Sequence, residues 1–311
     1  MSVPAPVAPV SKVSAPPAAL PTPLLAWVLL LVLAGIWGTS FILMKRGLEV
    51  FSALELGAAR VAIACLCLLP WAVRELPRTG RPYFKWLLLT GTVGTLLPAF
   101  LFAYAETRLA SGLAGVLNSL TALFTLLVGA ALFGQRLTGL RVLGIAVGLA
   151  GTAVLILLGS GAAVAGSGAL FGGYIVLATL CYGLSVNVVK HRLHGLAPLA
   201  VSSVSLALIG PLAAAVLFLG TDFSHKLATV PGAWAALGYI GLLAFFSTAV
   251  GLVLFNMLIR RSTTLFASSS TYLIPVVALG WGVADGEHIH LLHYVGMAII
   301  LLGVGIVNRA R

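Results

Sequence analysis

The segment WGTSFILMKR, Trp37 to Arg46, occurs a second time in altered form as YGLSVNVVKH, Tyr182 to His191. The two copies begin 145 residues apart, and each starts with an aromatic residue. They share a glycine, a serine and a lysine at equal positions: Gly38/Gly183, Ser40/Ser185 and Lys45/Lys190. The repeated segment raises the question of why one chain carries it twice.

A second pair of segments repeats at a similar spacing. FGQRLTGLRVLGIAVGLAG, Phe133 to Gly151, aligns with DGEHIHLLHYVGMAIILLG, Asp285 to Gly303, at a distance of 152 residues. Chance likeness between Gly- and Leu-rich segments explains a single pair well. Two blocks at nearly one spacing instead indicate an internal duplication.

The composition indicates a membrane protein. Of 311 residues, 60% are hydrophobic and only 8% are charged, which is too few charges to cover a water-exposed surface. The net charge of +11 comes from Lys and Arg in short gaps between apolar runs, a pattern of membrane orientation rather than of nucleic-acid binding. Cys65, Cys67 and Cys181 lie inside apolar runs and predict neither a disulfide nor a metal cluster.

About 20 predominantly apolar residues are needed for a helix to cross a bilayer. On this criterion the sequence predicts an all-α integral membrane protein with ten transmembrane helices. The predicted spans are 24–44, 52–73, 84–105, 111–133, 139–158, 168–190, 198–219, 232–257, 263–284 and 290–307. Residues 1–23, rich in Pro, Ala, Ser and Val, predict a disordered cytoplasmic tail, with a cleaved signal peptide as the alternative.

The basic residues orient these spans. With ten spans, thirteen of the 18 Lys and Arg residues fall on one face, and Arg60 lies inside the second span. The other face receives only four: Lys45, Arg46, Arg108 and Lys226. The positive-inside rule therefore predicts an inner-membrane protein with both termini cytoplasmic.

The duplication and the span count together predict an inverted repeat. Each unit, 24–158 and 166–308, holds five spans, and because five is odd the second unit enters the membrane from the opposite side. Secondary transporters use this arrangement to build two halves that rock about a site near the midplane. Lys45 then occupies at the outer face the place that Lys190 occupies at the inner face.

Over residues 24–308 the sequence resembles the EamA branch of the drug/metabolite transporter superfamily, whose members have ten spans in two such units. The resemblance rests on WGTSF, on the Arg of ELGAARVAIA, and on the blocks LFGQRLTGLRVLGIAVGLAGTAVL and SSSTYLIPVVALGWGVADGE. It departs from the family where LTALF around Ala122 lacks the usual proline and where Gln135 replaces an acid. Pro275 and Glu287 keep both features in the second half.

The resemblance implies a central cavity among the first, third, fourth, sixth, eighth and ninth spans. Aromatic and uncharged polar side chains in those spans are the predicted substrate-binding residues, because such groups suit a neutral or zwitterionic, partly apolar metabolite. Interhelical hydrogen bonds or an interfacial aromatic belt are the alternative for each residue alone. The candidates are Trp37, Tyr104, Asn118, Tyr182, Asn187, Asn256, Ser269 and Tyr272.

Arg60 is a charged residue about eight residues into the second predicted span, about 12 Å along the helix at 1.5 Å per residue. Glu55 is five residues away on a different side of the helix and is not positioned for an i, i+4 pair. We therefore predict Glu106 as the partner of Arg60 and a gating role for the pair. A structural arginine bonded to carbonyls or headgroups is the alternative.

Two other patterns allow alternatives. DGEHIHLLH, Asp285 to His293, combines acids and histidines that could bind a metal, but capping of a helix N-terminus by the acids is the favoured interpretation, so no metal or other cofactor is predicted. Gly144, Gly148 and Gly151, with Gly296 and Gly303, permit close helix packing within the chain, and a homodimer seam is the alternative.

The sequence thus predicts a secondary transporter for a small organic metabolite, an amino acid or related compound, with export implied by the resemblance. GxSxG, HExxH and GxxxxGK[ST] motifs are missing from the sequence, which argues against an enzyme. An uptake permease and a non-transporting membrane receptor or scaffold are the alternatives. The predicted partners are the small-molecule substrate and the lipid bilayer.

Overall fold

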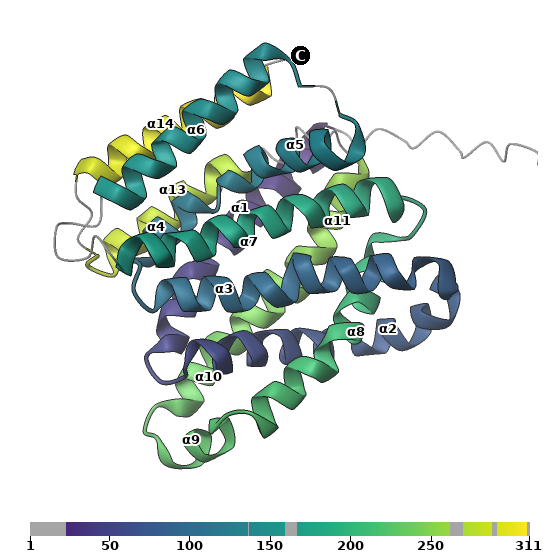
Figure 1. The fold of residues 1–311 in the computed structure, drawn as a ribbon. Coiled ribbons are helices and arrows are strands. Elements are labelled where there is room, and N and C mark those ends of the chain that lie inside the picture. The colour runs from purple at the N-terminus through teal and green to yellow at the C-terminus, as the bar shows by residue number, and fades with distance from the viewer. Residues whose placement is uncertain (1–22, 136, 159–166, 262–269, 288–290, 310–311) are drawn as a thin grey trace, which may run out of the picture.

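The computed structural model describes residues 23–135, 137–158, 167–261, 270–287 and 291–309. Every regular element in these ranges is helical (Figure 1). The predicted tail falls outside the described ranges, except for Pro23, which begins the first helix. The elements are α1 (Pro23–Leu48), α2 (Ala53–Gly91), η1 (Thr92–Leu96), α3 (Leu97–Glu106), α4 (Ser111–Leu117), α5 (Leu120–Phe133), α6 (Gly139–Leu158), α7 (Ser167–Arg192), α8 (Pro198–Leu219), α9 (Phe223–Thr229), α10 (Ala233–Leu242), η2 (Leu243–Val250), α11 (Gly251–Arg261), α13 (Ser270–Ala284) and α14 (Leu291–Arg309).

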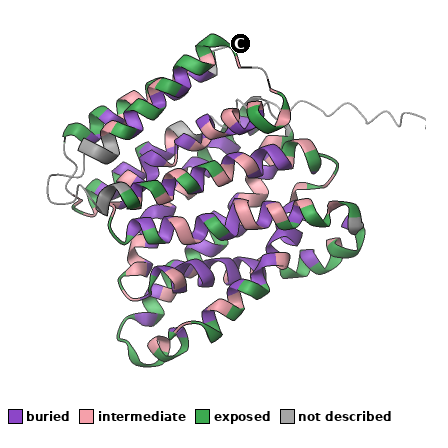
Figure 2. Cartoon of the chain, in the orientation of Figure 1, coloured by how far each residue is buried: buried purple, intermediate pink, exposed green. Residues whose placement is uncertain are grey.

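Seven helical stretches of the described chain are long and apolar enough to cross a membrane. They are Leu24–Leu48, Ala53–Thr79, Pro82–Glu106, Ser111–Phe133, Leu170–Arg192, Pro198–Leu219 and Ala233–Arg260. Three shorter apolar helices, Gly139–Val154, Leu273–Ala284 and Leu291–Val307, lie where the remaining predicted spans were placed. The chain is therefore a multi-pass membrane protein. Figure 2 shows exposed residues along the outer helices of the bundle, as expected for contact with lipid.

Helix α2 continues through the predicted gap between the second and third spans. Pro77 and Pro82 lie within this gap, and each lacks an N–H donor and disturbs the helical ladder around it. The helix begins at a capping box, in which Ser52 Oγ accepts from Glu55 N and Glu55 Oε2 accepts from Ser52 N. Lys226 Nζ, in α9, adds an ion pair to Glu55 Oε2 at 2.7 Å.

Two spans contain a π-helical segment, η1 in the third and η2 in the eighth. A π-helical turn shifts the register of the helix and is frequent at functional sites. The fourth span is interrupted between α4 and α5 at Asn118 and Ser119, although this span has no proline. All three irregularities lie next to the cavity described below.

Helices pack in pairs that are far apart in the sequence. Helix α2 packs against α8, α6 against α14, α1 against α13, and α5 against α7. In Figure 1, α6 and α14 form a pair along one edge of the bundle. A Cβ added to Gly144 would meet Gly303 O at 2.7 Å, and one added to Gly151 would meet Ile300 N at 2.7 Å, so the glycines allow the two backbones to approach closely. The predicted small-residue contact is thus formed within one chain.

Candidate functional site

A cavity of about 140 Å³ lies between the helices of the two halves of the chain. Its aromatic wall includes Trp37 of α1 and Tyr182 of α7, with Phe102 and Phe255 beside them. Trp37 Nε1 donates to Ser247 O at 3.0 Å, and its ring lies edge-on to Phe255 at 5.0 Å between centroids. Phe102 stacks on Tyr182 at 6.0 Å. These contacts fix flat apolar surfaces around the cavity.

The polar wall is made of amides, hydroxyls and one cation. Asn118 reaches the cavity from the break between α4 and α5, and Asn256 from α11. Asn256 Nδ2 donates to Ser202 Oγ at 2.9 Å. Among the described residues, Arg60 is the charged member of the lining, and its side chain is buried.

Arg60 is held by hydroxyl groups of η2. Its Nε donates to Thr248 Oγ1 at 2.8 Å, and its Nη2 donates to Ser247 Oγ at 3.3 Å. The predicted ion pair with Glu106 is not formed, and this prediction is corrected: the guanidinium turns toward η2, while both carboxylate oxygens of Glu106 are buried without a hydrogen-bond partner in the described chain. Arg60 is therefore part of the cavity wall.

The structure brings together four of the eight predicted binding residues: Trp37, Asn118, Tyr182 and Asn256. Tyr104 is exposed and packs on Tyr174 at 6.2 Å, so it lies away from the cavity. Asn187 is fully buried in helix contacts and does not line the cavity. Ser269 falls outside the described residues, as does the side chain of Tyr272.

Several lining residues were not predicted from the sequence. They are hydroxyl and aromatic side chains, including Thr90, Thr121, Ser202, Ser247, Thr248, Phe102 and Phe255. Ser205 also lines the cavity. It lies 145 residues after Arg60, which is the spacing of the first repeated segment, so it occupies the equivalent position in the second unit. The FFST segment of η2, which supplies the two partners of Arg60, is a polar interruption of an apolar span and could have signalled the site.

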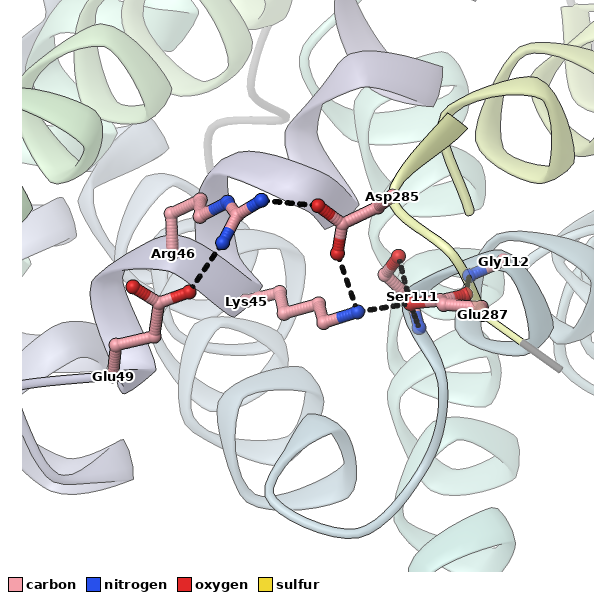
Figure 3. A network of polar contacts seen from close by, with 7 residues as sticks. All are labelled: Lys45, Arg46, Glu49, Ser111, Gly112, Asp285 and Glu287. Atoms are coloured by element: carbon pink, nitrogen blue, oxygen red, sulfur yellow. Dashed lines mark hydrogen bonds and ion pairs between the residues drawn. The ribbon is translucent and has the colours of Figure 1, made fainter. Parts of the chain in front are cut away.

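An ion-pair network joins the two halves of the chain at one side of the bundle. This network, here the ionic end, comprises Lys45 and Arg46 of α1, Asp285 and Glu287 after α13, and Ser111 (Figure 3). Lys45 Nζ lies 2.6 Å from Asp285 Oδ2 and 2.9 Å from Glu287 Oε1, and Arg46 contacts Asp285. Met44, which precedes Lys45, lines the cavity. The network therefore lies next to the cavity.

Glu287 caps a helix distant in the sequence. Its Oε1 accepts from Ser111 N at 2.9 Å and Ser111 Oγ at 2.7 Å, and its Oε2 accepts from Gly112 N at 3.0 Å. Capping of a helix N-terminus by this acid was predicted, but the helix is α4 rather than the last span. The carboxylates that suggested a metal alternative thus pair with two cations.

The contacts of the ionic end act on both acids. The hydrogen bond from Lys45 lowers the pKa of Asp285 below its ordinary value, and partial burial opposes this effect. Burial alone would raise the pKa of Glu287, but hydrogen bonds from Lys45, Ser111 and Gly112 outweigh it and lower the pKa. Both acids are therefore charged at neutral pH.

A network of amides joins the two halves at another place. This amide end comprises Gln135, Asn187, Thr125 and Gly183. Gln135 Nε2 donates to Asn187 Oδ1 at 3.2 Å, and Asn187 Nδ2 donates to Thr125 O and Gly183 O, both at 2.8 Å. Helix α7 begins beside α4 and runs to the far side of the bundle in Figure 1, so its C-terminal part with Asn187 lies opposite the start of α4. Thr125 and Val186 line the cavity, so this end also borders it.

An apolar multi-helix bundle with an internal cavity, lined by aromatic, hydroxyl and amide side chains and one cation, is typical of a membrane protein that holds a small molecule within the bilayer. The comparison with known families specifies it further. The chain belongs to the EamA-like transporter family, whose model matches residues 25–157 and again residues 169–309. This membership identifies it as a transporter rather than an enzyme.

Individual relatives cover nearly the whole chain. The chain is 29% identical to a "Probable terminal-alkyne amino-acid exporter" of Streptantibioticus cattleyicolor, over 91% of this chain and 93% of the relative. It is 27% identical to a "Probable amino-acid metabolite efflux pump" of Escherichia coli K12, over 89% and 92%. It is 28% identical to the "Uncharacterized inner membrane transporter YedA" of the same organism, over 89% and 88%.

A solved crystal structure has the same fold. It superposes with a TM-score of 0.64 and covers 92% of this chain and 98% of its own, at 19% sequence identity. The likeness concerns the fold alone.

Proposed function

We propose that this chain is a secondary transporter that exports a small organic metabolite, an amino acid or a related compound, by alternating access. The observation that carries this proposal is the cavity, because helices of both halves wall it and two separate side-chain networks join the halves. A site between two halves that can open alternately is the arrangement that alternating access requires.

We further propose ten spans arranged as two inverted repeats of five, 24–158 and 166–308. The two matches of the family model, to residues 25–157 and 169–309, support this division. Helix pairing supports it as well: α1 packs on α13 as α7 packs on α5, and α3 packs on α7 as α10 and α11 pack on α1. The π-helical segments η1 and η2 occur in corresponding spans.

The proposed location is the inner membrane, with both termini cytoplasmic. The basic asymmetry of the sequence supports this orientation, and one relative is described as an inner membrane transporter. In a background without native cysteines, Gly195→Cys is expected to react with an impermeant maleimide only from the cytoplasmic side, and Ser224→Cys only from the other side. Labelling of both positions from one side would contradict the inverted arrangement.

Transport itself is tested with purified protein in liposomes. Proteoliposomes loaded with the twenty proteinogenic amino acids at equal concentration are expected to release at least one of them faster than protein-free liposomes, as measured by mass spectrometry of the external medium. The names of two relatives support amino-acid compounds and export. Release at the protein-free rate for all twenty would contradict the proposed substrate class.

A further inference from the structure

Arg60 is a buried cation that no carboxylate contacts directly, although the buried Glu106 lies within electrostatic range of it. All seven acids of the chain lie in the described residues, and five of them pair with lysine or arginine elsewhere. The five are Glu49, Glu55, Glu75, Asp285 and Glu287. The two others, Glu106 and Asp222, form no ion pair with a described basic residue, Arg60 included. A buried charge within a spanning helix is costly unless it is compensated, so the missing anion requires an explanation.

The guanidinium also has unused hydrogen-bonding capacity. An arginine carries five N–H donors in a planar fork, and Arg60 uses its Nε and one Nη2 donor on Thr248 and Ser247. Both partners are neutral hydroxyls, which are weaker acceptors than a carboxylate. The remaining donors belong to a side chain that forms part of the cavity wall.

Three further polar groups of the same cavity lack partners. The hydroxyls of Thr90, Thr121 and Ser205 have no hydrogen-bond partner among the described residues, and Thr90 and Ser205 are more than nine-tenths buried. They come from three different helices and all line the cavity. Buried polar groups are normally satisfied, so several orphaned hydroxyls around one buried cation indicate a site for a polar ligand group.

We propose that Arg60 binds the carboxylate of the transported molecule, and this inference rests on the proposed transport function. An arginine fork matches the two oxygens of a carboxylate, and the orphaned hydroxyls supply hydrogen bonds to neighbouring polar atoms such as an amino group. The aromatic wall of Trp37, Phe102 and Tyr182 accepts an apolar side group. Because the described lining holds one cation, the site fits a small monocarboxylate rather than a polyanion.

Binding is tested by thermal stabilisation of the purified full-length protein. The probes are a mixture of the twenty proteinogenic amino acids and a mixture of the corresponding amino-acid amides, at the same low concentration. The acids are expected to raise Tm by about 2 °C or more, and the amides, from which the derivatives of Asp and Glu are left out, to leave it unchanged, because only the acids then carry a carboxylate. Equal stabilisation by both mixtures, or none by the acids, would overturn the proposal.

Three variants assign the effect to Arg60. Arg60→Gln removes the cation and is expected to weaken binding of the acids at least about 30-fold, whereas Arg60→Lys retains the charge and part of the stabilisation. Lys226→Gln, a matched control, removes a cation whose ion pair lies outside the cavity and should keep the full response. An unchanged response in Arg60→Gln would overturn the inference. Arg60→Gln is informative only if it folds. If it does not fold, the inference would be overturned by two results together: the amino acids no longer raise the Tm of Lys226→Gln, and they raise the Tm of Arg60→Lys as much as that of the wild type.

The outcomes for binding and for transport are separable. Stabilisation by the acids without release from proteoliposomes would contradict transport and leave the role of Arg60 standing. Release that proceeds at the wild-type rate in Arg60→Gln would contradict the role of Arg60 and leave transport standing.

Discussion

At the ionic end, Gly286 takes a positive φ of 77°, and Glu287 N then donates to Gly282 O at 2.9 Å. At the amide end, Gly134 takes a φ of 66°, and Gln135 N donates to Gly129 O at 3.0 Å. A turn with a glycine at positive φ therefore precedes a carboxylate at one end and a carboxamide at the other. Only a residue without a Cβ adopts this backbone conformation readily, which accounts for the glycine in both copies.

The side chains make the two ends unequal. Glu287 pairs with Lys45 and accepts hydrogen bonds from the start of α4, whereas the side chain of Gln135 donates one neutral hydrogen bond to Asn187. Charge-assisted hydrogen bonds are roughly twice as strong as neutral ones. The difference shows that a glycine turn can be followed by strong, charge-assisted hydrogen bonds at one end and by a weak, neutral hydrogen bond at the other end of the same transporter. We expect the amide end to open more readily.

The largest effect is expected for Glu287→Gln, which gives the ionic end the chemistry of the amide end. The amide has one acceptor oxygen and directs an NH2 group at N–H donors of α4 or at Lys45, so buried groups lose their partners. The expected loss is about 2–4 kcal/mol of stability. Thermal unfolding of the purified protein measures it, with Glu49→Gln at the exposed rim as control. A Tm equal to that of the control would show that the network does not hold this end closed.

The reverse exchange, Gln135→Glu, is expected to weaken the amide end by about 1–3 kcal/mol. The new carboxylate would face Asn187 Oδ1, because Asn187 Nδ2 already donates to Thr125 O and Gly183 O. Gln135→Met, of similar volume and without charge, serves as the comparison in the same thermal assay. Stabilisation by Gln135→Glu would mean that a basic residue near the amide end forms an ion pair with the new carboxylate. The two ends would then be chemically interchangeable.

These two ends also show what the sequence could and could not predict. The repeat identified Gly134, Gln135, Gly286 and Glu287 as counterparts, and the apolar runs located the helices. The partners of Glu287 could not be predicted, because Lys45 lies 242 residues away and only the packing of α1 on α13 brings it near. Pairing across such a separation leaves no local pattern.

The cavity was predicted in part for a related reason. Trp37 and Tyr182 line it, but Tyr104 faces outward, and the side chain of Asn187 is buried in hydrogen bonds between helices. In a soluble helix the polar side reveals which face is outward. In a membrane both the lipid-facing and the buried faces are apolar, so the rotation of each helix depends on packing that the sequence does not display.

Acid is expected to weaken the ionic end selectively. The pKa values of Asp285 and Glu287 are lowered in the folded protein, so the stability from these acids is fully present above the ordinary carboxyl pKa and is lost as pH falls through the lowered value. As pH falls from about 5 to about 3, through and below the ordinary carboxyl pKa, Tm should fall more in the wild type than in Glu287→Gln. Parallel curves for the two proteins would show that Glu287 does not contribute to the acid sensitivity. Gln135→Met should follow the wild type, since this exchange changes no carboxylate.

The smallest effect is expected for Arg46→Gln. Arg46 contacts Asp285 and Glu49 at the solvent-exposed rim of the ionic end, and its side chain is 40% exposed. Exposed ion pairs contribute about 0–1 kcal/mol, so the change in Tm should be small and should shrink further at high salt. A fall in Tm as large as that of Glu287→Gln would show that Arg46 at the rim, rather than the pair Lys45 and Glu287, contributes most of the stability of the network.

Opening of the cavity toward alternate sides is the central claim, and the reactivity of a cysteine within the cavity measures it most directly. With Cys65, Cys67 and Cys181 replaced by alanine, Thr121→Cys places a thiol in the lining, and a membrane-impermeant methanethiosulfonate is applied separately to each side of sealed vesicles. Adding Glu287→Gln should increase the reaction rate several-fold from the side of the ionic end and decrease it from the side of the amide end. Rates that change equally from both sides, or that do not change, would contradict alternating access controlled by these two ends.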